Sequence, residues 1–290
     1  MEIRSKIEKV IRALMKRARH KKEKSREQWL ALGYENTPEV SFIIESHNAS
    51  ASVATIVKRL RSLAHAEIIV IDDGSNLRHT KSLTKLMGGG DEFVIRANDL
   101  YENVMYDKAI RFSNGRYVVL LQDDDDLGDL EWVNRGLFYF RKYPDMAILG
   151  GFGGFTFEDD GEKCRSIPIP IETIKEKEFM FVHSVNRAPM IIDRILFDKY
   201  LKHIDFSFAP FQYDDTELCL RAWLSGLKVG WYNAGFTSLV AGGMRIWNNK
   251  FTQVQAERNS RLLHKMYGNL VAELNQLVSC AQEGCTKDRR

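Results

Sequence analysis

Between residues 39 and 142, short apolar runs alternate with segments of helical periodicity, and this alternation restricts the fold more than any other feature of the sequence. The runs typical of buried strands are Val40–Ile44, Glu67–Ile71, Glu92–Ile95 and Tyr117–Leu121. The segments with helical spacing are Ser52–Leu63, Leu77–Met87, Asn103–Ser113 and Leu130–Lys142. Strands and helices that alternate in this way predict an α/β domain, with a mainly parallel central sheet and crossover helices on its faces.

The second half of the chain is less regular. We expect a strand and a turn over Ala147–Phe157, and a loop or an edge strand over Ile167–Ile171, which contains two prolines. Asp215–Leu224 is predicted to be a helix with an acidic first turn, and Phe251–Val278 one long amphipathic helix. Residues 234–249 are rich in Gly and Asn and suggest a mobile segment.

Charge divides the chain unevenly and sets the expected domain boundaries. Residues 1–30 carry eleven Lys or Arg and four Glu, so the rest is net negative although the whole chain has a formal charge of +3. We expect a basic amphipathic helical arm over 1–37, an α/β domain over 38–248, and a C-terminal helix with a polar tail over 249–290. The arm is predicted either to pack on the domain or to lie on an anionic membrane surface.

The mildly acidic body argues against a nucleic-acid-binding protein. The four cysteines form no C-x-x-C pair and are not clustered with His at zinc spacing, which suggests a reducing, cytoplasmic compartment. No apolar run is long enough to span a bilayer, and no secretory signal is apparent. With the basic arm, these features predict a cytoplasmic protein with a peripheral contact at the inner face of the membrane.

Four consecutive carboxylates, Asp123 to Asp126, follow the strand predicted at Tyr117–Leu121. Adjacent negative charges repel one another, so the acids must either splay into water or share a cation. Carboxylate oxygens suit Mg²⁺, Mn²⁺ or Ca²⁺. Because ligands of open α/β sheets gather at the carboxyl ends of the strands, the run indicates a metal-assisted site at this edge, with a solvated acidic turn as the alternative.

Two further acidic pairs, Asp72-Asp73 and Asp214-Asp215, also follow a strand or open a helix. The motifs in chain order are Val40-Ser41-Phe42-Ile43-Ile44-Glu45-Ser46-His47-Asn48, Ile71-Asp72-Asp73-Gly74-Ser75, Gln122-Asp123-Asp124-Asp125, and Asp214-Asp215-Thr216-Glu217 with Arg221. Four such motifs in this order resemble glycosyltransferase family 2, whose members are inverting enzymes with the GT-A nucleotide-diphospho-sugar transferase fold. The resemblance covers roughly residues 39–245 and implies a Rossmann-like sheet with helical extensions at both ends.

The resemblance implies a donor site at the carboxyl ends of the first two strands. There Asp73 would accept a hydrogen bond from a uracil-like base and His47 would stack on it. The full set of donor-binding residues implied is Ser46, His47, Asn48, Asp73, Asp107, Asp123 and Arg245. The family's D-x-D motif falls on Gln122-Asp123-Asp124, so Asp124 is the expected ligand of Mn²⁺ or Mg²⁺, with Asp123 beside it on the metal or the ribose.

The resemblance also implies that Asp215 is the general base, which removes the proton of the acceptor hydroxyl as that oxygen attacks the anomeric carbon. Asp214 and Glu217 are its rivals, although Glu217 is also placed to pair with Arg221 one helical turn on. The segment Asn186-Arg187-Ala188-Pro189 is expected on the acceptor side. Asp107 stands where many members have Asn, and no His follows the base between residues 234 and 249.

The expected function is the metal-dependent transfer of one sugar from a nucleotide sugar, with UDP favoured, to a hydroxyl of a glycan or a lipid-linked acceptor. A processive enzyme is disfavoured because the Q-x-x-R-W motif and membrane spans are absent. A nucleotidyltransferase would need a Gly-rich phosphate loop with Lys near the first strand, which Glu45 to Ser50 does not supply. The alternative is a non-catalytic member that binds a sugar nucleotide or scaffolds a glycan-assembly complex.

Overall fold

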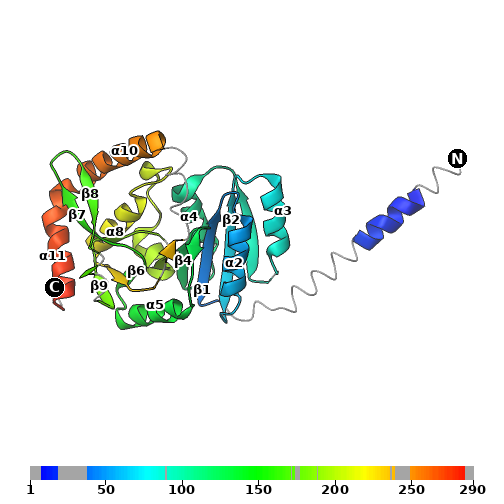
Figure 1. The fold of residues 1–290 in the computed structure, drawn as a ribbon, viewed down its shortest axis with the longest axis horizontal. Coiled ribbons are helices and arrows are strands. Elements are labelled where there is room, and N and C mark those ends of the chain that lie inside the picture. The colour runs from blue at the N-terminus through cyan, green and yellow to red at the C-terminus, as the bar shows by residue number, and fades with distance from the viewer. Residues whose placement is uncertain are drawn as a thin grey trace.

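The computed structural model describes residues 8–18, 38–88, 90–170, 172–173, 177–187, 189–235, 237–238 and 249–284. Its centre is a mixed, mostly parallel sheet in the order β3-β2-β1-β4-β11-β6-β12-β9 (Figure 1). These strands are β1 Val40–Ser46, β2 Ala66–Asp73, β3 Glu92–Ala97, β4 Tyr117–Leu121, β6 Met146–Gly150, β9 Phe179–Phe181, β11 Met190–Asp193 and β12 Lys228–Tyr232. Strand β11, in the middle of the sheet, runs antiparallel to both of its neighbours, β4 and β6.

Helices cover both faces of the sheet, because each strand alternates apolar side chains between two cores. In β4, Val118 and Leu120 enter the core on one face, and Val119 and Leu121 enter the core on the other. The first core includes side chains of α4 Tyr101–Phe112, α8 Asp214–Leu224, α10 Asn249–Tyr267 and α11 Val271–Gln282. The second includes those of α2 Ser50–Leu60, α3 Leu77–Leu86 and α5 Glu131–Lys142.

Parallel pairing brings the carboxyl ends of β1, β2 and β4 to one edge. Ser46 is level with Asp72 in the neighbouring strand, and Ile44 is level with Leu121. The motifs that follow these strands in the sequence therefore meet in space. A short hairpin lies outside the sheet, with β7 Gly154–Asp159 antiparallel to both β8 Cys164–Pro168 and β10 Ser184–Val185. A two-stranded sheet pairs β5 Asp125–Asp126 with β13 Thr237–Ser238.

The first half agrees closely with the sequence predictions, and the second half differs in detail. The expected strand and turn over 147–157 is two strands, β6 and β7, and Ile167 lies in the hairpin strand β8. The C-terminal helical segment is present, but Gly268–Leu270 forms a 3-10 turn that divides it into α10 and α11. Most of residues 234–249 lies outside the described residues.

Within the expected N-terminal arm, residues 8–18 are helical and every one of them is exposed. Val10, Ile11, Leu14 and Met15 stay 49–68% exposed. Apolar side chains that pack on a domain lose most of their exposure, so this part of the arm makes no core contact. None of the described helices combines the length and the apolar character that a bilayer crossing requires.

Candidate active site

Residues 46 to 48 follow β1 and are held by the turns beside them. The Nδ1 atom of the His47 imidazole lies 2.6 Å from the Asp73 carbonyl oxygen, and its Nε2 atom lies 2.9 Å from Asn48 Nδ2. Asn48 has a left-handed backbone (φ 57°) and accepts a hydrogen bond from Asn76 N. His47 is nevertheless exposed, so the ring is fixed in place with a face open to solvent.

The two acids at the end of β2 have different surroundings. Asp73 accepts hydrogen bonds from Leu100 N at 2.9 Å and Tyr101 N at 2.8 Å, and so it caps the start of α4. Asp72 is fully buried, and among the described residues neither its carboxylate oxygens nor the Ser46 hydroxyl beside it has a hydrogen-bond partner. Unsatisfied buried polar groups cost free energy, so a polar group that reached these two side chains would be bound favourably.

Two carboxylates of the acidic turn after β4 accept hydrogen bonds from backbone N–H groups. Asp123 accepts from His47 N at 2.9 Å, which ties the ends of β4 and β1 together. Asp125 accepts from Gln122 N at 2.7 Å. Burial, reinforced by the neighbouring carboxylates, raises the pKa of Asp123 to about 6 and the pKa of Asp125 to about 8. Ionising these carboxylates in the folded chain is therefore unfavourable, and a cation bound beside them would offset that cost.

A divalent cation fits this donor set. The turn offers only hard oxygen ligands, which Mg²⁺ and Mn²⁺ prefer, and such ions are typically held by one or two carboxylates together with substrate phosphates. In the described part of the chain, the acids of this turn do not form a closed cage of three ligand atoms. Asp124 and the adjacent Asp123 are the two carboxylates that would hold the ion.

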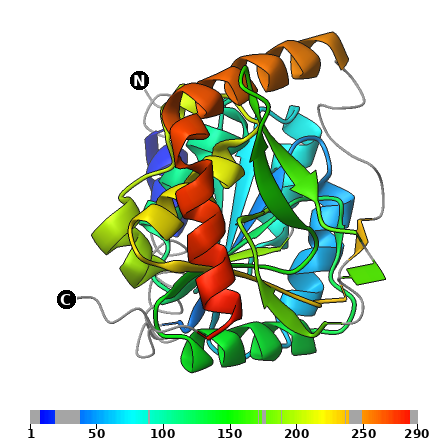
Figure 2. The same ribbon diagram turned by 90° about the vertical axis from the view of Figure 1, so that its left-hand side faces the viewer.

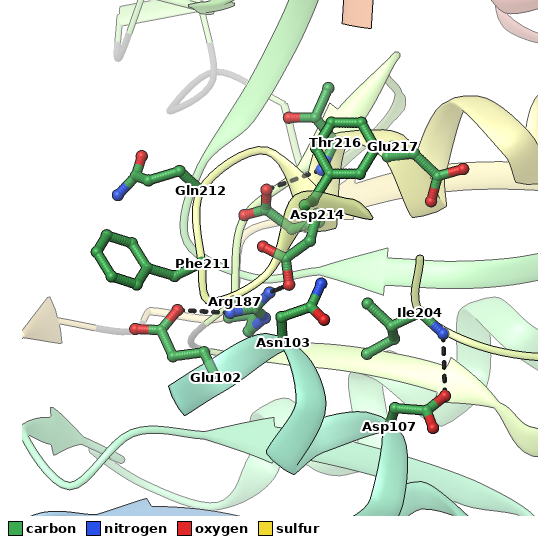
Figure 3. Close-up of polar contacts among 12 residues, drawn as sticks. Glu102, Asn103, Asp107, Arg187, Ile204, Phe211, Gln212, Asp214, Thr216 and Glu217 are labelled. Carbon is green, nitrogen blue, oxygen red and sulfur yellow. Dashed lines mark hydrogen bonds and ion pairs between the residues drawn. The ribbon is translucent and has the colours of Figure 1, made fainter. Parts of the chain in front are cut away.

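Arg187 is a buried cation at the centre of the site, where it contacts acids of α4 and α8 (Figure 3). The sequence predicted only that the segment Asn186-Arg187-Ala188-Pro189 lies on the acceptor side. The Arg187 guanidinium donates to Glu102 Oε2 at 2.5 Å and to Asp214 Oδ2, and lies 5.0 Å above the Tyr106 ring. Burial alone would lower the pKa of Arg187, but Asp214, Glu102 and Asp215 raise it, so the side chain stays charged. Gln122 Nε2 lies 3.4 Å from Glu102 Oε1 and extends the network to the acidic turn.

Glu45, at the end of β1, also belongs to this cluster. Burial raises the pKa of Glu45 well above its usual value, and the Glu102 carboxylate raises it further while Arg187 opposes the shift. Sequence reasoning assigned no role to Glu45 or Glu102. In the sequence, Glu45 is only a charged residue at the end of an apolar strand, and Glu102 only a charged residue after an aromatic one. Both patterns are too common to identify a site.

The three acids at the start of α8 are separated by their contacts. Asp214 is buried and paired with Arg187. Glu217 is also buried, and its carboxylate accepts from Arg221 Nε at 2.7 Å and from the Tyr267 hydroxyl at 2.8 Å. Asp215 is half-buried, and its Oδ1 accepts from Thr216 N. Asp215 alone combines partial exposure with a position beside Arg187, which suits a group that must meet an acceptor.

Two expected donor-binding residues are not brought to this cluster by the described structure. Asp107 is fully buried, where it accepts from Ile204 N at 3.0 Å and pairs with Arg111, and Figure 3 shows it directed away from Arg187. Its carboxylate thereby fastens α4 to the segment before α8. Arg245 lies outside the described residues.

The segment that leads into α8 has an unusual backbone. Gln212 and Tyr213 both have positive φ angles, 75° and 66°. Asn259 of α10, fully buried, donates through Nδ2 to the carbonyls of Phe208 at 2.9 Å, Phe211 at 3.1 Å and Gln212 at 2.8 Å. Left-handed non-glycine residues are costly and persist where surrounding contacts enforce them, so α10 fixes the entry to Asp214 and Asp215.

Comparisons with known proteins show the family and the fold of the chain. A family model described as Glycosyl transferase family 2 matches residues 41–201, more than half of the chain. No curated protein sequence matches the chain. Among solved structures it is similar to GalNAc-T7 with UDP, GalNAc and Mn²⁺, with a TM-score of 0.55 and 17% identity over 69% of this chain and 43% of that one.

The chain is also similar to S. aureus TarS 1-349 in complex with UDP-GlcNAc, with a TM-score of 0.52 and 14% identity over 83% of this chain and 70% of that one. Likenesses at such identities show the fold, which is the GT-A arrangement of a mixed, mostly parallel sheet between helices. The match of the family model to more than half of the sequence shows more than the fold: this protein is a member of glycosyl transferase family 2.

Proposed function

We propose that the protein is a metal-dependent inverting glycosyltransferase that moves a single sugar from a UDP-sugar to a hydroxyl of a glycan or a lipid-linked acceptor. The observation that carries the proposal is one polar network across the carboxyl edge of the sheet. It runs from Gln122 in the acidic turn through Glu102 and Arg187 to Asp214. The network joins the turn suited to a cation to the helix that presents Asp215.

Each half of the site has a distinct task in the proposed reaction. Asp124 and Asp123 would hold Mn²⁺ or Mg²⁺, and the ion, when bound, neutralises negative charge on the leaving diphosphate. His47 and Asn48, held at the end of β1, would contact the nucleoside. Asp215 would accept the proton of the acceptor hydroxyl, so that its oxygen attacks the anomeric carbon from the face opposite the leaving group.

The preference for UDP is supported by the two similar structures, one with UDP and one with UDP-GlcNAc. The fixed but exposed imidazole of His47 offers a flat surface for a base. The chain spans less than half of the GalNAc-T7 chain, so the acceptor is proposed by chemistry alone, as a hydroxyl within reach of Asp215.

Calorimetric titration with UDP, GDP, CDP and UDP-sugars, each with Mn²⁺ and with chelator, tests the donor half. We expect one nucleotide family to bind only with the metal, and Asp124→Ala to abolish that binding while circular dichroism stays unchanged. Asp129→Ala, which changes an exposed acid near the same turn, is the control. A folded protein that binds none of these nucleotides with metal would refute the proposal.

The exposed helix at residues 8–18 supports a proposed contact with an anionic membrane at its cytoplasmic face. Val10, Ile11, Leu14 and Met15 fall at helical spacing, and Lys9, Arg12, Lys16 and Arg17 surround them. Such helices lie in the interface with their apolar face in the lipid and their cations on the headgroups. This contact would bring the enzyme to a lipid-linked acceptor.

A further inference from the structure

A second cluster of metal-ligating side chains lies outside the nucleotide-sugar site. Asp159 ends β7, Cys164 begins β8, and the two face each other as a pair in the hairpin. His264 comes from α10, close to the junction with α11, and its Nδ1 lies 2.8 Å from Asp159 Oδ1. Figures 1 and 2 show the hairpin lying beside this pair of helices.

The three side chains have the spacing of ligands that share one ion. One oxygen, one sulfur and one nitrogen atom all lie within 4.8 Å of one another, and this is the only such group of three in the described part of the chain. Tetrahedral zinc with bonds of about 2.0–2.3 Å holds its ligand atoms about 3.3–3.8 Å apart, so the group would close around the ion by up to about 1 Å. The mixture of thiolate, imidazole and carboxylate suits Zn²⁺ and is unlike the oxygen-only turn after β4.

The surroundings favour a cation at this point. The Asp159 carboxylate faces Cys164 across the hairpin, so a cation bound between them would lie beside a negatively charged group. Gly268 leaves the space that the ligands occupy, because a Cβ there would lie 2.8 Å from Asp159 Oδ2 and 2.9 Å from His264 Nδ1. The His264 side chain is 35% exposed, which gives an ion a path from solvent and leaves room for a water ligand.

We propose that Asp159, Cys164 and His264 form a Zn²⁺ site, with water as fourth ligand, that fastens the β7–β8 hairpin to the junction of α10 and α11. Binding releases the Cys164 proton to solvent and replaces the hydrogen bond between Asp159 and His264 by bonds to the ion. Both elements also touch the entry to α8, because Ser166 of the hairpin lies 2.8 Å from the Thr216 hydroxyl and α10 carries Asn259. By fixing the hairpin and α10 to each other, the ion would stabilise the segment that positions Asp215 without contacting Asp215 itself.

Cobalt substitution tests the site with a readout that the nucleotide-sugar site does not give. Co²⁺ bound to a thiolate has an intense near-ultraviolet charge-transfer band, whereas Co²⁺ on carboxylates has none. We expect one equivalent of Co²⁺ to produce this band in the full-length protein, and one equivalent of Zn²⁺ to remove it. Zn²⁺ should also raise the midpoint of thermal unfolding, and a chelator should reverse the rise.

Variants assign the band to its ligands. Cys164→Ser should abolish it and weaken Zn²⁺ binding by roughly 100-fold or more, and His264→Asn, at a partly exposed position, should do the same with the fold intact. Cys219→Ser and Cys280→Ser replace the other described thiols and should leave the band unchanged. A wild-type protein without the band, or a band that survives in both Cys164→Ser and His264→Asn, would overturn the proposal.

Discussion

Asp214 and Asp215 are adjacent in the chain, yet their carboxylates have different surroundings. Burial raises the pKa of Asp214 to about 7 even though Arg187 opposes the shift, and such a value would suit a general base. Its side chain is only 1% exposed and is held by Arg187, so an acceptor hydroxyl has no access to it. A general base must first lie within hydrogen-bond distance of the acceptor hydroxyl, and its pKa matters only then. Accessibility therefore favours Asp215 over Asp214 as the proposed base.

Asp215→Asn should leave nucleotide binding intact and lower kcat by about 10²–10⁴-fold, because the amide cannot take the acceptor's proton. Product formation by a single-turnover assay and donor affinity by calorimetry separate the two effects. Asp198→Asn, an exposed acid paired with Arg194, is the control that should keep full activity. Full activity of Asp215→Asn would transfer the role of base to another group.

Arg187→Met should lower the free energy of unfolding by about 3–5 kcal/mol, because it leaves Asp214 buried without its counter-charge. Adding Asp214→Asn should restore part of the loss, since a neutral amide needs no cation. Urea unfolding measures both. Arg141→Met breaks the exposed pair with Glu39 and should cost less than about 1 kcal/mol. Equal effects of the Arg187 and Arg141 changes would contradict a buried ion pair.

At the level of elements, side-chain hydrogen bonds from α10 hold the segment that leads into α8 in its conformation. Asn259→Asp keeps the shape but replaces the donor that serves three carbonyls with an oxygen that repels them. We expect kcat to fall by roughly 10- to 100-fold with donor affinity unchanged, since Asp215 is displaced. Steady-state kinetics test this, with the exposed Asn134→Asp as the control. A loss of donor affinity instead would place Asn259 in the nucleotide half.

The packing of helix α11 is expected to make the stability of the protein depend on pH, through a contact with His183. His183 Nε2 lies 2.8 Å from Asn275 Oδ1 of this helix. Burial lowers the pKa of His183 despite this contact. Below about pH 6.5 the unfolded chain binds a proton that the native chain resists, so stability should fall as pH drops through that value. His183→Gln should reduce the slope of unfolding free energy against pH, and His203→Gln, at an exposed site, should not. Identical slopes in all three proteins would exclude His183 as the cause.

At the scale of the whole molecule, the arm and the domain are expected to act independently. Removing residues 1–37 should abolish sedimentation with anionic vesicles and leave the melting temperature unchanged, because residues 8–18 are exposed and β1 begins at Val40. Leu14→Gln with Met15→Gln keeps every charge but breaks the apolar stripe, and should weaken binding as well. Binding that is unaffected by the deletion would assign membrane contact to the domain.

The strand ends that carry Ser46, Asp73 and Asp123 could be predicted because each follows a short apolar run and the parallel register aligns them. Local pattern was enough there. The division of the C-terminal helix at Gly268 was not predicted, since a single glycine is tolerated in many helices. Only the structure shows that Asp159 and His264 lie where a Cβ at this position would be.

Sequence patterns were sufficient to predict the family, the alternation of strands and helices, and the acidic turn at the sheet edge, because these depend on residues that are near neighbours in the chain. Which acid is held in an ion pair and which is accessible depends instead on how distant segments pack together. Arg187 lies 85 residues from Glu102 and 27 from Asp214, and no local pattern encodes that meeting. Burial and charge pairing are properties of the packed chain, and the roles proposed at this site rest on them.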